Sequence, residues 1–173
     1  MKQVQWFNRE FRFESTQNIF PSIIERLLGT PIRLEEKMKS IPTELLTARM
    51  DNTWTIKENI GHLADLEPLW QGRLEDILNR KEELRPTDLQ NTMTTQANHN
   101  DKPLKDLLSS FKLARTGTLF RLANLTEEQV FMSSLHPRLG TSMRTMDLFL
   151  FVADHDDHHL ARITELANTL KTR

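Results

Sequence analysis

Apolar residues recur every three or four positions along most of the chain, which places them on one face of an α-helix. Four long stretches show this spacing: from about Phe20 to Ser40, from Thr55 to about Asn79, from about Pro103 to Asn124, and from near Thr145 to about Leu170. Alternation of the kind expected for strands is rare. The pattern therefore predicts an all-α fold in which four main helices pack as a four-helix bundle.

Two local signals mark helix starts. Thr55 is followed three residues later by Glu58, and Thr126 by Gln129. In both pairs the threonine side chain can accept from a backbone N–H, and the longer side chain can reach back to the threonine N–H, which forms a capping box. The first box should open the second long helix, and the other should open a short additional helix.

Prolines predict where two helices are interrupted. Pro21 suits the first turn of the first helix, where the missing N–H has no cost. Pro31 lies mid-helix and should kink that helix or split it, because proline removes a backbone hydrogen bond. Pro68 should bend the second helix for the same reason.

The segments between the helices differ in character. Residues 81–101 are polar and predict a long crossover connection that includes a helical turn. Residues 136–140 predict a turn. Residues 1–18 are expected to form an N-terminal arm, extended over residues 6–13, that serves as a lid or a dimer element. The chain, residues 1–173, is expected to form one domain.

Composition narrows the chemistry. The 173 residues include 23 basic and 24 acidic side chains, which are interspersed and give a formal net charge of −1. No basic stripe predicts binding to nucleic acid. The chain has no cysteine, which excludes disulfides and thiolate metal sites and leaves histidine and carboxylate as strong metal ligands. No run approaches the ~18 apolar residues of a membrane span, so a cytoplasmic protein with no membrane contact is expected.

Histidines on two predicted helices form the candidate functional site. His155 and His159 are four residues apart and therefore stack on one helix face. Leu148 and Phe151 precede them on the same side, so this face should point inward. His62 lies among apolar residues of the second helix, and facing helices of a bundle are where metal sites are built. Together the three imidazoles predict a site for one divalent transition-metal ion.

Other interpretations of the histidines stay open from spacing alone. The patch could be solvated surface, or a set of core histidines satisfied by hydrogen bonds. His158 is three residues from His155 and could replace His159 as a ligand. His99 and His136 are expected to be structural, although His136 could reach the open end of a cavity.

Metal-bound histidines usually donate their second ring N–H to a carboxylate or carbonyl. Asp65, one turn after His62, is the preferred candidate for this role, and Glu58 and Asp156 are the alternatives. The segment from His155 to His159 resembles the helical zinc-protease motif only superficially, because Asp156 stands where that motif has glutamate. The paired Glu-x-x-His motifs of di-iron bundles are absent.

Two segments resemble the DinB-like superfamily, also called DinB/YfiT-like metalloenzymes. Residues 54–67, WTIKENIGHLADLE, are similar to the family pattern W-S/T-x-x-E-x-x-x-H-L-x-x-x-E. Residues 155–163, HDDHHLARI, are similar to its H-x-x-x-H segment on the last helix. The resemblance covers nearly the whole chain and implies a four-helix bundle. It also implies a metal site of three histidines, His62, His155 and His159, and so favours His159 over His158.

The resemblance further implies zinc or nickel as the metal and a homodimer as the assembly. Characterised relatives include thiol-S-transferases that use low-molecular-weight thiols, and a mycothiol-dependent maleylpyruvate isomerase. Many relatives carry glutamine where this chain has Arg162, a cation that could favour an anionic substrate or simply point outward.

These observations give a functional expectation. The chain should be a metal-dependent thiol-S-transferase or hydrolase with a small-molecule substrate, in which the ion activates a thiol cofactor or a water. Asp65 and Arg162 are its candidate catalytic residues. One alternative is a metal-binding or stress-response dimeric protein without catalysis. The other is a bundle whose histidines only stabilise the core.

Overall fold

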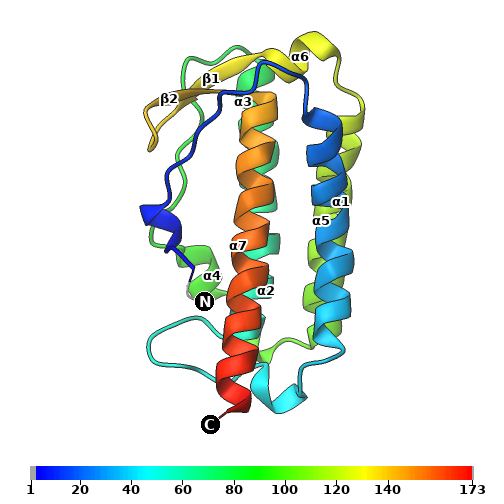
Figure 1. Ribbon diagram of the computed structural model, residues 1–173, viewed down its shortest axis with the longest axis vertical. Helices are drawn as coiled ribbons and strands as arrows, with labels where there is room; N and C mark the ends of the chain where they lie inside the picture. The colour runs from blue at the N-terminus through cyan, green and yellow to red at the C-terminus, as the bar shows by residue number, and fades with distance from the viewer. Residues whose placement is uncertain (1–2, 173) are drawn as a thin grey trace.

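Four helical segments run side by side in the computed structural model, which describes residues 3–172 (Figure 1). They are α1 (Phe20–Met38), α2 (Ile56–Asp65) continued by α3 (Glu67–Leu78), α5 (Leu104–Ala123) and α7 (Thr145–Lys171). Helices α1 and α2 each pack against both α5 and α7. The predicted four-helix bundle is confirmed. Within residues 3–172, no helix combines the length and the apolar character that crossing a membrane requires.

The predicted crossover connects α3 to α5 and contains helical turns. It includes α4 (Thr92–Gln96) and the 3-10 helix η3 (His99–Asp101), and both pack against α2. Two further 3-10 helices, η1 (Trp6–Asn8) and η2 (Thr43–Leu45), lie before α2, and the short α6 (Glu127–Phe131) follows α5. The crossover therefore brings its polar residues back onto the helix that carries His62.

A small hairpin between α6 and α7 was not predicted. Strands β1 (Ser133–His136) and β2 (Thr141–Arg144) pair antiparallel, and His136 stands opposite Thr141. Gly140 has a φ of 63°, a backbone conformation that glycine adopts readily in the connecting turn. The predicted turn at residues 136–140 is confirmed. Strands of four residues are too short for their alternation to stand out in the sequence.

The predicted caps are present, and the two prolines inside the predicted helices have different effects. Both threonine capping boxes, at Thr55 and Thr126, form with reciprocal hydrogen bonds. Pro31 does not split α1, which is a single helix from residue 20 to residue 38. At Pro68 the second helix does not merely bend, because α2 ends at Asp65 and α3 begins at Glu67.

The core has two apolar halves separated by a buried polar layer. One half gathers the start of α1, α3 and the start of α7, and the other gathers the end of α1, α2, the start of α5 and the end of α7. Between them lie polar side chains that are at most 6% exposed: Thr30, His62, Glu67, Arg115, Thr118, His155, Asp156 and His159. The mid-bundle layer is therefore where buried chemistry is concentrated.

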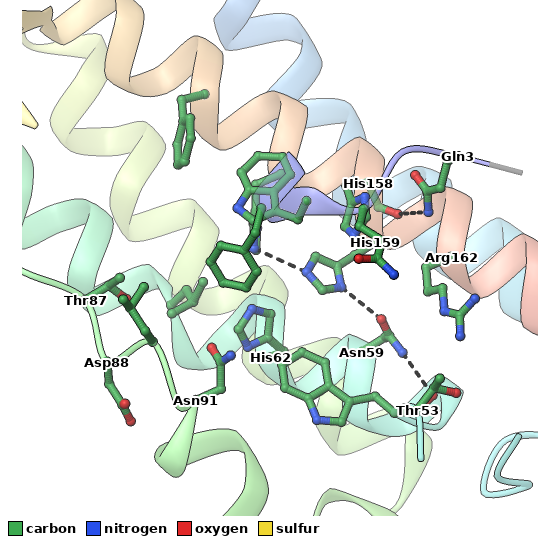
Figure 2. A pocket seen from close by; sticks show the side chains of 18 of the residues that line it. Gln3, Thr53, Asn59, His62, Thr87, Asp88, Asn91, His158, His159 and Arg162 are labelled. Atoms are coloured by element: carbon green, nitrogen blue, oxygen red, sulfur yellow. Dashed lines mark hydrogen bonds between the residues drawn. The ribbon is translucent and has the colours of Figure 1, made fainter. Parts of the chain in front are cut away.

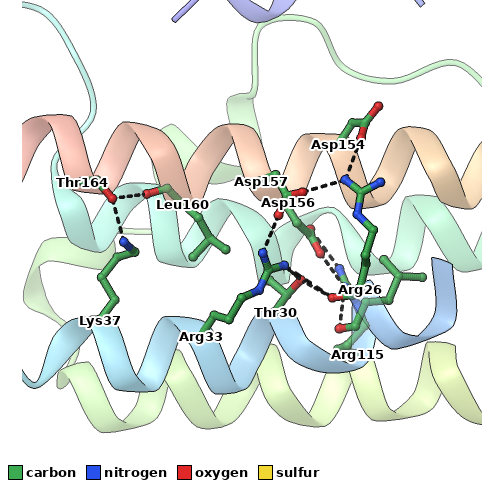
Figure 3. Close-up of polar contacts among 11 residues, drawn as sticks. Arg26, Thr30, Arg33, Lys37, Arg115, Asp154, Asp156, Asp157, Leu160 and Thr164 are labelled. Carbon is green, nitrogen blue, oxygen red and sulfur yellow. Dashed lines mark hydrogen bonds and ion pairs between the residues drawn. The ribbon is translucent and has the colours of Figure 1, made fainter. Parts of the chain in front are cut away.

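Arg115 joins four helices within this layer. From α5 its guanidinium lies 2.6 Å from Glu67 Oε1 of α3 and 2.6 Å from Asp156 Oδ2 of α7. It also donates to the carbonyl oxygen of Leu27 in α1, at 3.3 Å. Figure 3 shows Arg115 beside Asp156. Residue 31 would normally donate to that carbonyl, and Pro31 cannot. The proline thus frees an acceptor for the buried arginine.

The N-terminal arm packs along the bundle beside α7 (Figure 1). The Trp6 ring lies 5.0 Å from the Phe151 ring, and Arg144 Nη1 donates to the carbonyl oxygen of Ser15 at 2.9 Å. Residues 3–18 thus form an arm, but residues 6–8 are the 3-10 helix η1 and not the extended backbone predicted for residues 6–13. The role of the arm as a lid or a dimer element stays a prediction. Residues 1, 2 and 173, which belong to the predicted arm and the predicted domain, lie outside the described residues.

We expect Asp156→Asn to lower the free energy of unfolding by about 1.5–3 kcal/mol, because it removes the hydrogen bonds between the Asp156 carboxylate and the buried Arg115, which keeps Glu67 as its counterion. Urea unfolding followed by circular dichroism measures the change. The control is Glu75→Gln, which removes a half-exposed partner of Arg121 and should change stability by less than about 1 kcal/mol. Equal losses in the two variants would contradict the structural role of Arg115.

Candidate metal centre

Three histidines converge in the mid-bundle layer. His155 and His159 come from α7 and His62 from α2, and each is at most 6% exposed. The Nε2 atoms of His155 and His159 lie 3.2 Å apart, and one ring nitrogen from each of the three residues lies within 4.8 Å of the others. Figure 2 shows His62 and His159 facing each other across the bundle.

His158 lies beside this cluster without joining it. Its ring centre is 5.3 Å from that of His159, and the three-histidine group includes His159 instead. Burial and the charge of Arg9 lower the pKa of His158 to about 4. The four-residue spacing of His155 and His159 thus gives convergence, whereas the three-residue spacing turns His158 toward the N-terminal arm, where Trp6 is its neighbour.

Asn59 orients His159. The Asn59 Nδ2 donates to the carbonyl oxygen of Thr55 at 2.8 Å, and its Oδ1 lies 2.9 Å from His159 Nδ1 (Figure 2). Since the amide oxygen can only accept, Nδ1 carries the imidazole proton. The lone pair of His159 is therefore on Nε2, which faces His155.

A chain of hydrogen bonds orients His62. His62 Nδ1 lies 3.0 Å from Thr94 Oγ1, and that hydroxyl donates to Asp65 Oδ2 at 2.8 Å. Because the hydroxyl proton is committed to Asp65, Oγ1 accepts from His62 Nδ1, and the lone pair of His62 is on Nε2. His99 Nε2 approaches the same carboxylate oxygen at 2.8 Å. A side chain at Gly61 would collide with the His99 ring.

The predicted carboxylates have different outcomes. Asp65 supports His62, but through Thr94 and not by direct contact. Glu58 caps α2 and binds Arg49, so it does not contact an imidazole nitrogen. Asp156 pairs with Arg115 on a different face of α7, because it is one residue away from His155 and the helix turns it about 100°.

The remaining candidates line the site or support it. Arg162 lines the cavity and pairs with Glu165 at 2.6 Å, so its charge is partly balanced. His136 is buried and forms part of the cavity wall, as the sequence allowed. His99 has the structural role predicted for it, as a partner of Asp65.

Burial keeps the three clustered histidines neutral. It is the largest cause that lowers the pKa of His62, to about 4, and it holds the pKa of His155 and of His159 well below the usual value. The neighbouring imidazoles lower the pKa of these two residues further. Neutral imidazole is the form that binds a metal ion.

A cavity of about 530 Å³ opens onto the cluster. Its walls include three tryptophans, of which Trp6 lies 5.0 Å from the His155 ring and Trp54 lies 4.6 Å from the His62 ring. Trp70 completes this aromatic wall, 5.8 Å from His155. Water-excluding walls beside a polar cluster are typical of small-molecule sites.

The nitrogen positions fit one metal ion. A tetrahedral ion with bonds of about 2.0–2.1 Å to nitrogen sets its ligand nitrogens about 3.3 Å apart, close to the 3.2 Å between His155 and His159. Two of the three Nε2 lone pairs are fixed by hydrogen bonds at Nδ1. His155 Nδ1 has no hydrogen-bond partner among residues 3–172.

Sequence reasoning missed several residues of the site. Asn59 lies one turn before His62, inside the segment that resembles the family. Its position on the same side of the helix as His62 could have indicated that it belongs to the site. Thr94 and Trp6 belong to segments without helical periodicity. Their approach to the histidines depends on how the crossover and the arm fold back, which no local pattern indicates.

In the presence of a chelator, which keeps the protein free of metal, we expect the free energy of unfolding to fall as the pH drops from about 6.5 to about 4. In the unfolded chain these histidines take up protons near pH 6.5, while in the folded chain their pKa is lowered. The unfolded state thus binds more protons in this window, with a cost of up to about 1.4 kcal/mol per pH unit for each histidine. Urea unfolding at several pH values measures the slope, and His62→Gln should reduce it. An unchanged slope in that variant would contradict a neutral, buried His62.

Comparison with known proteins agrees with this fold. The family model of the DinB superfamily matches residues 26–163, which contain all three clustered histidines. The solved structure of YfiT from Bacillus subtilis, described as a probable metal-dependent hydrolase with an unusual four-helix bundle topology, matches with a TM-score of 0.79. The two chains are 22% identical, and the match covers 94% of each. A search of curated proteins found no match. The chain belongs to the DinB superfamily.

Proposed function

We propose that this protein is a metal-dependent hydrolase whose divalent ion is bound by the Nε2 atoms of His62, His155 and His159. The observation that supports this most strongly is the convergence of three neutral, buried imidazoles at the wall of a cavity. The likeness to YfiT, itself described as a probable metal-dependent hydrolase, favours this class of reaction.

The donor set favours a catalytic ion over a structural one. Structural zinc sites are usually closed by four protein ligands, whereas catalytic sites have three and keep a position open. Among residues 3–172, no fourth histidine or carboxylate joins the cluster. The cavity reaches the histidines and could admit a substrate there. A metal-binding module without catalysis would need neither feature.

The side chains around the site have separate tasks. When bound, the ion would supply Lewis acidity, which activates a water or a thiol at neutral pH. Asn59 holds His159, and Thr94 with Asp65 holds His62, so that both rings present Nε2. Trp6 packs against the ring of His155, and Trp54 packs against the ring of His62. Imidazole ligands suit zinc and nickel, and these are the metals we propose.

We expect His155→Ala to lose bound metal, because it removes one of three ligands. Elemental analysis after dialysis against zinc or nickel measures the stoichiometry, and thermal melting checks that the variant folds. The matched control is His158→Ala, which removes the neighbouring imidazole outside the cluster and should retain one ion per chain. Equal metal content in His155→Ala and the unmodified protein would refute the assignment.

We expect Thr94→Val to weaken metal binding by about 10–100-fold, the usual effect of removing a group that orients a ligand. Competition with a chromogenic chelator measures the affinity. Thr95→Val is the matched control, since the Thr95 hydroxyl is exposed and bonds only to carbonyl oxygens of its own turn. No difference between the two variants would argue against the role of Thr94 and Asp65.

A direct activity test compares the zinc-loaded, nickel-loaded and metal-free protein in a panel of carboxylic and phosphoric esters. We expect hydrolysis that requires metal and is lost in His155→Ala. A parallel screen of thiol transfer with several low-molecular-weight thiols distinguishes a thiol-S-transferase from a hydrolase. Metal-dependent thiol transfer without any hydrolysis would overturn the proposed reaction while leaving the metal site in place.

A further inference from the structure

A second group of polar residues lies in the same cavity, away from the three histidines. It consists of Arg73 from α3, His136 from β1 and Arg138 from the hairpin turn. Arg73 is 1% exposed, and its Nε donates to the carbonyl oxygen of Arg85 at 3.1 Å. Its Nη1 lies 3.0 Å from His136 Nε2. Its Nη2 is buried and has no hydrogen-bond partner among residues 3–172.

Arg73 has no ion-pair partner within the described residues, and neither has Arg138. The charge of Asp76 acts on Arg73 and raises its pKa, but this carboxylate pairs with other cations, at 2.8 Å from Arg85 and 3.1 Å from Lys81. By contrast, Arg115, the other fully buried arginine, has two carboxylates. Burial, followed by the charge of Arg138, lowers the pKa of Arg73 to about 10. A buried charge without a paired counterion is costly. Arg115 avoids this cost through its two carboxylates, whereas Arg73 does not.

His136 does not supply the hydrogen-bond acceptors that the Arg73 guanidinium lacks. Nη1 of Arg73 faces one ring nitrogen of His136, and the backbone N–H groups of Arg138 and Leu139 lie 3.2 and 3.3 Å from the other. A neutral imidazole has a single acceptor nitrogen, and burial lowers the pKa of His136 to about 4. Donors therefore outnumber acceptors around this ring, and the pocket end is electropositive.

An aromatic wall links this group to the histidine cluster. The Trp70 ring lies 5.6 Å from the Arg73 guanidinium carbon and 5.8 Å from the His155 ring. The Phe151 ring lies 5.6 Å from the His136 ring. A ligand that spans the cavity would thus have an anionic end, an apolar middle and a group at the histidines.

We propose that Arg73 and Arg138 form an anion-binding subsite that takes the carboxylate of an organic acid substrate. The assignment of this acid as a substrate, with its scissile group at the histidines, depends on the function proposed above. The subsite itself depends only on the two arginines. The Nη2 of Arg73, which has no partner among residues 3–172, is suited to a carboxylate oxygen, which supplies the acceptor that the pocket lacks.

Isothermal titration of the chelator-treated, full-length protein tests the subsite without the metal. The probes are phenylacetate and phenylacetamide, which have similar shapes and differ in charge. We expect phenylacetate to bind about 10–100-fold more tightly, as for hydrogen bonds to a charged group. Equal binding of the two probes would overturn the proposal. Phenyl phosphate is the third probe, and tighter binding of this dianion than of phenylacetate would overturn the carboxylate class.

Variants connect the binding to the arginines. Arg73→Met should abolish the preference for phenylacetate. Because Arg73 is buried and this variant could fail to fold, Arg138→Gln, at a less buried position, is the second test and should weaken phenylacetate binding at least about threefold. The control is Arg121→Gln, which removes an exposed arginine outside the cavity and should leave binding unchanged. Full phenylacetate affinity in Arg138→Gln would contradict the subsite.

Zinc binding and phenylacetate binding, measured on the same protein, distinguish the anion-binding subsite from the metal site. If zinc binds with His155-dependent stoichiometry but phenylacetate shows no preference over the amide, the subsite is refuted and the metal site stands. If phenylacetate binding depends on the arginines but no metal binds, the proposed hydrolase is refuted and the subsite stands.

Discussion

The ion pairs of Arg115 with Glu67 and Asp156 are the constraint on which the rest of the structure depends. They lie in the middle of the bundle, where a buried charge is unfavourable unless an opposite charge lies beside it. One guanidinium fixes α3, α7 and, through the carbonyl oxygen of Leu27, α1 around α5. Since Asp156 directly follows His155, the contact that fixes α7 in the core also fixes the helix face that carries His155 and His159.

The mid-bundle layer shows two ways to bury polar groups. On one side of α7 the charges are paired, and on the other the histidines avoid charge by staying neutral. The Nε2 lone pairs of His62 and His159 are available because Thr94, itself bonded to Asp65, and Asn59 accept the Nδ1 protons of these two rings. Arg73, outside this layer, departs from both solutions, because it is buried and pairs with no carboxylate among residues 3–172. Buried polar groups are thus paired where they support the fold, and one lacks a partner where the cavity opens.

Sequence patterns predicted what depends on local periodicity. The four helices, the capping box at Thr55 and the convergence of His155 with His159 all follow from residues three or four positions apart. The choice of His159 over His158 came from the family resemblance, and the geometry of the cluster agrees with it. The outer contacts could not be predicted this way, because Thr94 and Trp6 reach the site through long-range folding of irregular segments. The hairpin was missed because its strands have only four residues each.

The central claim is that three histidines bind one ion and leave part of its coordination open. X-ray absorption spectroscopy of the zinc-loaded protein measures this most directly, because imidazole ligands give a distinct multiple-scattering pattern. We expect three imidazole nitrogens at about 2.0–2.1 Å from zinc, together with at least one oxygen that is not from a side chain. A spectrum with two or fewer imidazoles, or with a fully closed shell of protein ligands, would contradict it.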